Sequence, residues 1–122
     1  MNIKTTIVIG GLLLLAAPLT FACDYPERPL IPDGSTASKD DMLTAKTDVS
    51  AYLTGVDEYL ICVEADEKAA VAELENPDPA DLKKRDEMLG KKFDAANDEK
   101  ALIGEEFNQQ VRAYNAARKA AQ

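Results

Sequence analysis

The sequence predicts an all-α protein, a long antiparallel hairpin of two coiled-coil-like helices that follows an extended proline-rich N-terminal strap. Three observations lead to this fold class. Apolar residues recur at steps of three and four along residues 39–75 and again along 80–120, which is the spacing of one helix face. Pro77 and Pro79 interrupt this pattern, and a connection this short makes the two helices antiparallel neighbours. The stretch 23–37 contains three further prolines and cannot be helical.

Residues 1–22 have the features of a secretory signal peptide of bacterial type. Lys4 gives a short positive start, an apolar run from Ile7 to Ala17 follows, and small residues precede a cut after Ala22. An apolar run of about 11 residues is too short to span a bilayer. We therefore expect an exported protein, periplasmic or secreted.

Cleavage after Ala22 would make Cys23 the first mature residue, and this leaves a second possibility open. Lipoprotein signals also end directly before a cysteine, which then carries the lipid. Their usual pattern has Leu three residues ahead of that cysteine, where this chain has Thr20. We expect a soluble exported protein, and contact with a membrane only if Cys23 is lipidated.

Cys62 is the only other cysteine of the chain. Two cysteines in an oxidising compartment allow one connectivity, Cys23–Cys62. The disulfide would close a loop of about 40 residues, and the chain-entropy model gives it roughly 4 kcal/mol. No CxxC motif is present, so we interpret the pair as structural.

The strap is long enough to place Cys23 beside Cys62. Its prolines recur every third residue, the repeat of a polyproline II helix, and Asp33-Gly34 then turns the chain. Fully extended, the strap spans roughly 45–50 Å, against about 36 Å from the helix start at Ser38 to Cys62. We expect it to double back along the hairpin. Three of its residues are available to pack there: Tyr25, Leu30 and Ile31.

The first helix is predicted over about residues 39–75. Ser38 is a suitable N-cap, and Asp40 and Asp41 place negative charge in the first turn, where the helix dipole favours it. Gly55 in mid-helix suggests close packing or a weak point. The predicted seam consists of Met42, Ala45, Val49, Tyr52, Val56, Tyr59 and Val63.

The second helix is predicted over about residues 80–120, with Asp78 as N-cap and Pro79 as first helical residue. Lys100 and Gln110 interrupt its apolar seam, and polar seam residues fix register. A turn centred near residue 77 places Lys100 opposite residue 55, so we expect Lys100 to approach Gly55. The predicted seam consists of Leu82, Leu89, Phe93, Ala96, Ile103, Phe107, Tyr114, Ala117 and Ala121.

A two-helix hairpin buries one stripe per helix, so its core is thin and some apolar surface needs cover. If the strap does not provide it, self-association into a four-helix bundle would, and a homodimer is therefore possible. Five residues outside the narrow seam form the candidate interaction face: Leu53, Leu60, Ile61, Leu102 and Val111.

Charge excludes several classes of function. Without residues 1–22, the chain has 13 basic and 22 acidic residues, a net charge of −9, so we expect no nucleic-acid partner. Without histidine, imidazole chemistry and the usual zinc sites are excluded. We interpret the acidic first helix as a solvated face, with a site for cations or a basic partner as the alternative. We predict no catalytic, cofactor or metal-binding residues and no enzymatic activity.

The stretch Cys23-Asp24-Tyr25-Pro26, then Ile31-Pro32-Asp33-Gly34 and an acidic helix with one cysteine, resembles small uncharacterised exported proteins of proteobacteria. The resemblance covers the strap and the first helix, and it implies an exported, helical protein without activity. We expect a protein of the bacterial envelope that acts by protein–protein interaction, as an adaptor, chaperone or inhibitor. The alternative is a structural envelope element anchored through an acylated Cys23.

Overall fold

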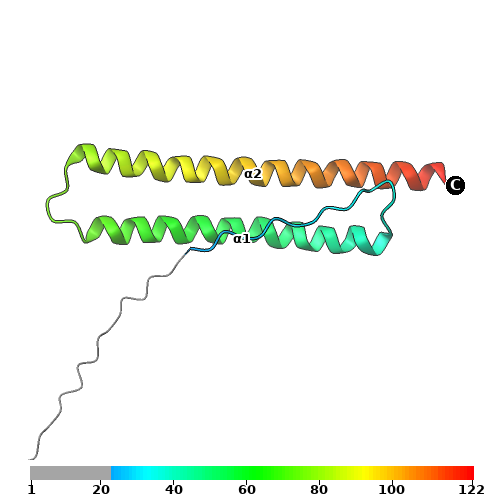
Figure 1. The fold of residues 1–122 in the computed structure, drawn as a ribbon, viewed down its shortest axis with the longest axis horizontal. Coiled ribbons are helices and arrows are strands. Elements are labelled where there is room, and N and C mark those ends of the chain that lie inside the picture. The colour runs from blue at the N-terminus through cyan, green and yellow to red at the C-terminus, as the bar shows by residue number, and fades with distance from the viewer. Residues whose placement is uncertain (1–22) are drawn as a thin grey trace, which may run out of the picture.

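The computed structural model describes residues 23–122, so the expected signal peptide lies outside the described residues. Two long helices, α1 (Lys39–Ala72) and α2 (Pro79–Ala120), pack against each other as an antiparallel hairpin (Figure 1). Residues 23–122 contain no strand. The predicted all-α hairpin is confirmed. Within these residues, neither helix has a segment long and apolar enough to cross a membrane.

The helix starts follow the predicted caps. The Ser38 hydroxyl accepts a hydrogen bond from the Asp41 N–H at 3.1 Å, and the Ser38 N–H donates to the Asp41 carboxylate at 3.0 Å. This reciprocal pair is a capping box. At the start of α2, the Asp78 carboxylate accepts from the Ala80 N–H at 2.8 Å, and Pro79 is the first helical residue.

The first helix is shorter than expected, because α1 ends at Ala72 and not at residue 75. Glu73 caps it, and the chain then turns through Asn76, whose φ of 51° is left-handed. Asparagine tolerates this conformation, which no right-handed helix can include. The reversal therefore starts several residues before the two prolines that mark it in the sequence.

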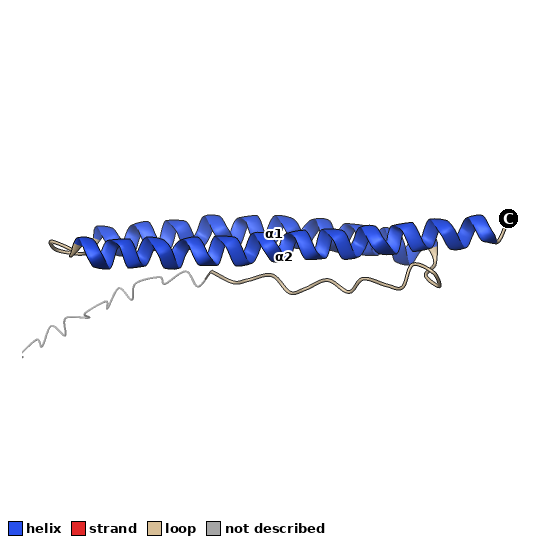
Figure 2. Ribbon diagram, turned by 90° about the horizontal axis from the view of Figure 1, so that it is seen from above, coloured by secondary structure: helices blue, strands red, loops and turns tan. Residues whose placement is uncertain are grey.

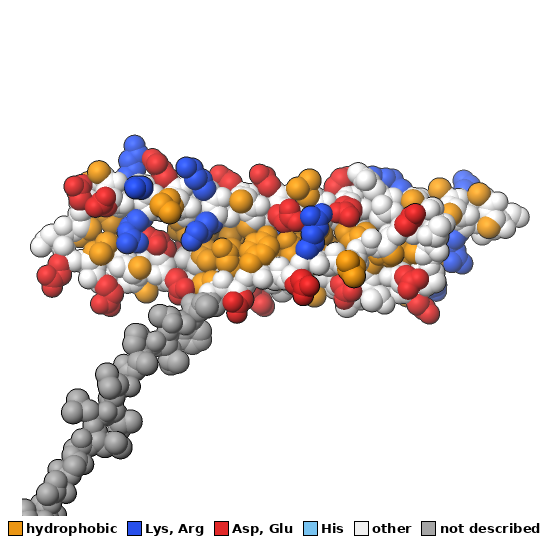
Figure 3. Space-filling view, viewed as in Figure 1, with side chains coloured by type: hydrophobic (Ala, Val, Ile, Leu, Met, Phe, Trp, Pro, Cys, Tyr) orange, Lys and Arg blue, Asp and Glu red, His pale blue; other side chains and the backbone are white. Residues whose placement is uncertain are grey.

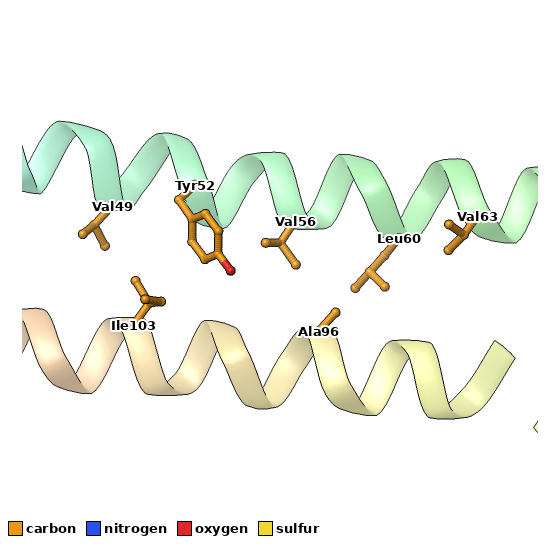
Figure 4. Close-up of a cluster of buried hydrophobic side chains, with 7 residues drawn as sticks. All are labelled: Val49, Tyr52, Val56, Leu60, Val63, Ala96 and Ile103. Carbon is orange, nitrogen blue, oxygen red and sulfur yellow. The ribbon is translucent and has the colours of Figure 1, made fainter. Parts of the chain in front are cut away.

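The seam of α1 agrees with the predicted one at six of its seven positions (Figure 4). The exception is Leu60, which is buried in place of Tyr59. Tyr59 lies on the flank of α1 that the strap covers, and its ring packs on Tyr25 with the centroids 4.9 Å apart. On α2, Ala96 and Ile103 are fully buried, while Leu89, Phe93 and Phe107 are half-buried against the same core.

The strap runs back along one face of the hairpin, as predicted (Figure 2). Cys23, Pro26, Pro29 and Pro32 are half-buried at every third position, which is the period of a polyproline II rod with one edge on the helices. Ile31, next to this edge, is also half-buried and packs against the core, as expected. Leu30 is off this edge and is 91% exposed, so the expectation that it packs was wrong.

Candidate functional site

The strap is joined to α1 by a disulfide between Cys23 and Cys62, with the Cα atoms 5.7 Å apart. The Asp66 carboxylate lies 3.1 Å from the Cys23 Sγ, a close contact and not a hydrogen bond, because a disulfide sulfur has no proton to donate. The two sulfurs and this carboxylate oxygen lie within 4.8 Å of one another. Metal ligation by cysteine requires thiolates, and the disulfide has none, so this cluster is a structural joint.

Three tyrosines pack where the strap crosses α1. The Tyr25 ring meets Tyr59 and Tyr52 edge to face, at centroid distances of 4.9 Å and 6.3 Å. The Tyr25 and Tyr52 hydroxyls lie 3.2 Å apart. Burial, and then the hydrogen bond with Tyr25, raise the pKa of the Tyr52 phenol well above its ordinary value. Tyr52 therefore stays protonated at physiological pH and serves as a packing and hydrogen-bonding group.

Polar contacts attach the other side of the strap to α2. The Arg28 guanidinium binds Glu106 at 2.8 Å and Glu99 at 3.4 Å, and the hydrogen bond to Glu106 is the main reason that the pKa of Arg28 is raised. The Gly34 N–H donates to the Gln110 Oε1 at 2.9 Å. The strap thus contacts both helices and covers the groove between them. Figure 3 shows this face, with apolar side chains in a band bordered by charges.

Lys100 does not approach Gly55, which corrects one expectation. Its ammonium forms an ion pair with Asp57, two residues farther along α1. Gly55 instead lies under the strap, where an added Cβ would come 3.1 Å from the Pro26 Cβ. The predicted register was therefore wrong by only two residues. At 100° per residue, however, Asp57 and Gly55 lie on different flanks of α1. Pro26 of the strap fills the space above Gly55.

The five residues of the predicted interaction face do not form one surface. Leu60 is only 6% exposed, so its place in an exposed face was wrong; it faces α2 in the core. Leu53 and Val111 are half-buried. Ile61 and Leu102 are 68% and 61% exposed on different helices, and Leu102 borders a shallow hollow formed by α2 alone.

A groove of about 650 Å³ lies between the N-terminal part of α1 and the C-terminal part of α2, on the flank opposite the strap. At 100° per residue, Val111 and Lys46 lie on one side of the helix–helix contact, and Glu106 and Gly55 on the other. The apolar side chains along the groove are those of Met42, Leu43, Phe107, Val111 and Tyr114.

The charged residues that line this groove are all basic. They are Lys39, Lys46 and Arg118, and the other polar groups are the amides of two asparagines and the hydroxyl of Tyr114, which accepts a hydrogen bond from the Arg118 guanidinium. Arg118 lies over the Tyr114 ring, with its guanidinium carbon 5.2 Å from the centroid. Sequence reasoning missed this site. The seven-residue spacing of Lys39 and Lys46 could have indicated a common helix face, and a turn near residue 77 places the start of the first helix opposite the end of the second. The sequence does not show how far each helix is rotated about its axis, so it does not place Arg118 on the same side as the two lysines.

A second groove, of about 520 Å³, lies between the helices near the turn. Its charged residues have both signs, and Arg85 and Glu67 form an ion pair there at 3.0 Å. The strap does not reach this part of the hairpin, because it ends at the disulfide with Cys62.

Comparison of the chain with protein-family models, with curated proteins and with solved structures found no match. The resemblance of the strap to exported proteins of proteobacteria therefore stays an expectation.

Proposed function

We propose that this chain is an exported, non-enzymatic protein of the bacterial envelope that binds a protein partner through the face of the hairpin opposite the strap. An adaptor, a chaperone and an inhibitor all act through such a surface. The observation that carries the proposal is the asymmetry of the two faces: the strap covers one groove between the helices, while the opposite groove keeps half-exposed Phe107 and Val111 along its length.

Apolar groups that stay half-exposed between two helices offer binding free energy to a third element that covers them, because burial of apolar surface contributes about 25 cal/mol per Å². On the other face the strap covers apolar surface in this way, with Tyr25 on Tyr59 and Pro26 above Gly55. The raised pKa of Tyr52 is explained by its burial in the core and then by its hydrogen bond with Tyr25 of the strap. A role in binding therefore fits the arrangement better than catalysis.

The lipid-anchored alternative needs the same sulfur atom. An acylated Cys23 carries its lipid on Sγ as a thioether, and this atom is bonded to the Cys62 sulfur. The disulfide therefore favours the unanchored protein. The intact mass of the protein isolated from its native envelope separates the two proposals, since a lipid adds several hundred daltons and a disulfide removes two hydrogens.

Site-specific photo-crosslinking in the native envelope tests the proposal. A photoreactive side chain at Asn108, which lines the groove, is expected to give a discrete crosslinked product with another protein. The matched control is Leu102, which is also exposed on α2 but lies on the flank of Glu99 and Glu106, where the strap is bound. Equal products from both positions, or a product from Leu102 alone, would contradict the proposed binding face.

A further inference from the structure

The groove opposite the strap differs from the rest of the protein in its electrostatics. The chain without residues 1–22 has a net charge of −9, yet the groove is lined by three cations and no carboxylate. Within the described part of the chain, Lys39, Lys46 and Arg118 have no carboxylate within ion-pair distance. By contrast, Lys100, on the same flank nearer the middle of the hairpin, pairs with Asp57.

We propose that this groove binds an acidic amphipathic helix of a partner protein, an inference that rests on the proposed function and specifies its partner. Helix-in-groove recognition uses apolar anchors at i, i+3 or i+4, and i+7. Here the anchors would lie on Phe107, Val111 and Leu43, and the flanking Asp and Glu side chains would meet the three cations. The binding helix would become the third helix of a bundle.

The dimensions of the groove fit this occupant. From Phe107 to Arg118 the groove follows α2 for about 16 Å, which is three turns of a helix laid alongside it. The Lys100–Asp57 ion pair connects the helices beyond the groove toward the middle of the hairpin. Leu43 is half-exposed at its edge, so the apolar strip is open to solvent over its length and a helix can approach from the side.

The charges select the sign of the partner. A basic helix would bring its lysines against Lys39, Lys46 and Arg118, and like charges at an interface cost binding free energy. An acidic helix would replace water around the three cations with carboxylates. Arg118, which is held over the Tyr114 ring, is presented to a carboxylate with little further loss of side-chain freedom.

The test uses two synthetic 18-residue peptides with identical leucine anchors, one with Glu and one with Lys at the polar positions. Each carries a fluorophore and is titrated with the oxidised protein obtained by expression of the whole chain. We expect the Glu peptide to bind, with an affinity that falls as salt is raised, and the Lys peptide to bind at least about tenfold more weakly.

The variant Lys39→Glu/Lys46→Glu/Arg118→Glu reverses the charge of the groove. It is expected to bind the Glu peptide about tenfold more weakly, or more weakly still. The matched control, Lys83→Glu/Lys84→Glu/Lys91→Glu, changes the net charge equally in the part of the hairpin near the turn. It is expected to have a much smaller effect. All the substituted side chains are exposed on helices, and circular dichroism checks that both variants remain helical.

Several results would overturn the inference. They are equal binding of the two peptides, no binding of the Glu peptide, and equal losses in the two variants. Sedimentation showing a dimer that the groove variant dissociates would assign the groove to a second copy of this chain. Binding of phosphatidylglycerol vesicles in preference to the Glu peptide would assign it to a lipid surface. A crosslinked protein from Asn108 together with any of these results would retain the proposed function and reject its acidic-helix partner.

Discussion

The two halves of the hairpin have similar helices and different cores. The strapped half consists of the strap with residues 39–63 of α1 and 93–118 of α2, and it contains all nine buried apolar residues of the described chain. The turn half, residues 64–92, contains no buried residue. It has apolar residues of its own, including Leu74, Met88 and Leu89, but the helices there leave an open groove between them.

This difference shows what two helices can and cannot do alone. Each helix presents a narrow stripe to the other, and the flanks of that stripe remain open to water. In the strapped half, a third chain segment closes one flank and the seam residues become inaccessible. Val56 and Ile103 are completely buried there. In the turn half both flanks stay open, and Val71 and Leu89 in comparable seam positions remain half-exposed.

Removal of the disulfide that holds the strap should have the largest effect on stability. Cys23→Ser/Cys62→Ser removes the disulfide, and we expect the free energy of unfolding to fall by about 4 kcal/mol, from the loop-entropy estimate for this separation. Hydrogen exchange of residues 49–63 should then approach the rates of the turn half, which should change little. Thermal denaturation and exchange measured by mass spectrometry test both statements. A uniform increase across both halves would contradict the division into two regions.

The turn of the strap provides the next test. In Gly34→Ala the new Cβ would overlap the Gln110 carbonyl oxygen and would lie 2.9 Å from the Tyr114 nitrogen. These are backbone atoms of α2, so the turn must move away and its hydrogen bond to Gln110 is lost. We expect a loss of about 1–3 kcal/mol in chemical denaturation.

Gly104→Ala is the matched control for this substitution. Gly104 also lies on the hairpin, but its added Cβ meets nothing within 4 Å. We expect a gain of about 0.5–1 kcal/mol, because alanine favours the helix over glycine. A gain at Gly34 as well would show that α2 does not hold the turn of the strap there.

A smaller effect is expected at Gly55, where two contributions oppose each other. Alanine should stabilise α1 by about 1 kcal/mol, but its Cβ would press on Pro26 at 3.1 Å. We expect Gly55→Ala to raise the free energy of unfolding by the full amount in the Cys23→Ser/Cys62→Ser protein, and by less in the disulfide-bonded protein. Urea denaturation of the four proteins measures this coupling. Equal gains in both backgrounds would show that the strap does not press on Gly55.

Sequence patterns predicted the hairpin because apolar spacing and paired prolines are local signals. They predicted the disulfide because only two cysteines exist and the strap has the reach. These patterns failed where the rotation of a helix about its axis determines which of two neighbouring side chains is buried. Tyr59 and Leu60 are neighbours in the sequence, but Leu60 faces α2 in the core while the Tyr59 ring packs on Tyr25 of the strap.

The basic groove was not predictable for a related reason. It combines Lys39 and Lys46 from the start of α1 with Arg118 near the end of α2. Their proximity can be predicted only when both the register of the two helices and the rotation of each helix about its axis are known. The total charge of the chain also gave no indication of the groove, because the chain as a whole is acidic and no acidic residue lines the groove.

The smallest expected effect is a change in the pKa of Asp41, at the junction of the strap and α1. It tests where the strapped half ends. The Ser38 hydroxyl and N–H both donate hydrogen bonds to the Asp41 carboxylate, and they hold the pKa of that carboxyl below its ordinary value of 3.8. The folded state therefore binds this proton less readily than the unfolded chain. Its contribution to stability is present above pH 3.8 and is lost as the pH falls through the folded pKa.

An NMR titration of the carboxyl carbon measures this pKa. In Ser38→Ala the hydroxyl donor is lost while the N–H donor remains, so the pKa of Asp41 should rise part of the way to its ordinary value. In Cys23→Ser/Cys62→Ser it should stay low, because the capping box is local to the start of α1. The Ser35 hydroxyl and N–H lower the pKa of Asp33 in the turn of the strap. These donors are also local, so we expect that pKa to stay low when the disulfide is removed. A rise at both positions would mean that the start of α1 unfolds together with the strap, and the strapped half would then be one cooperative unit down to its N-cap.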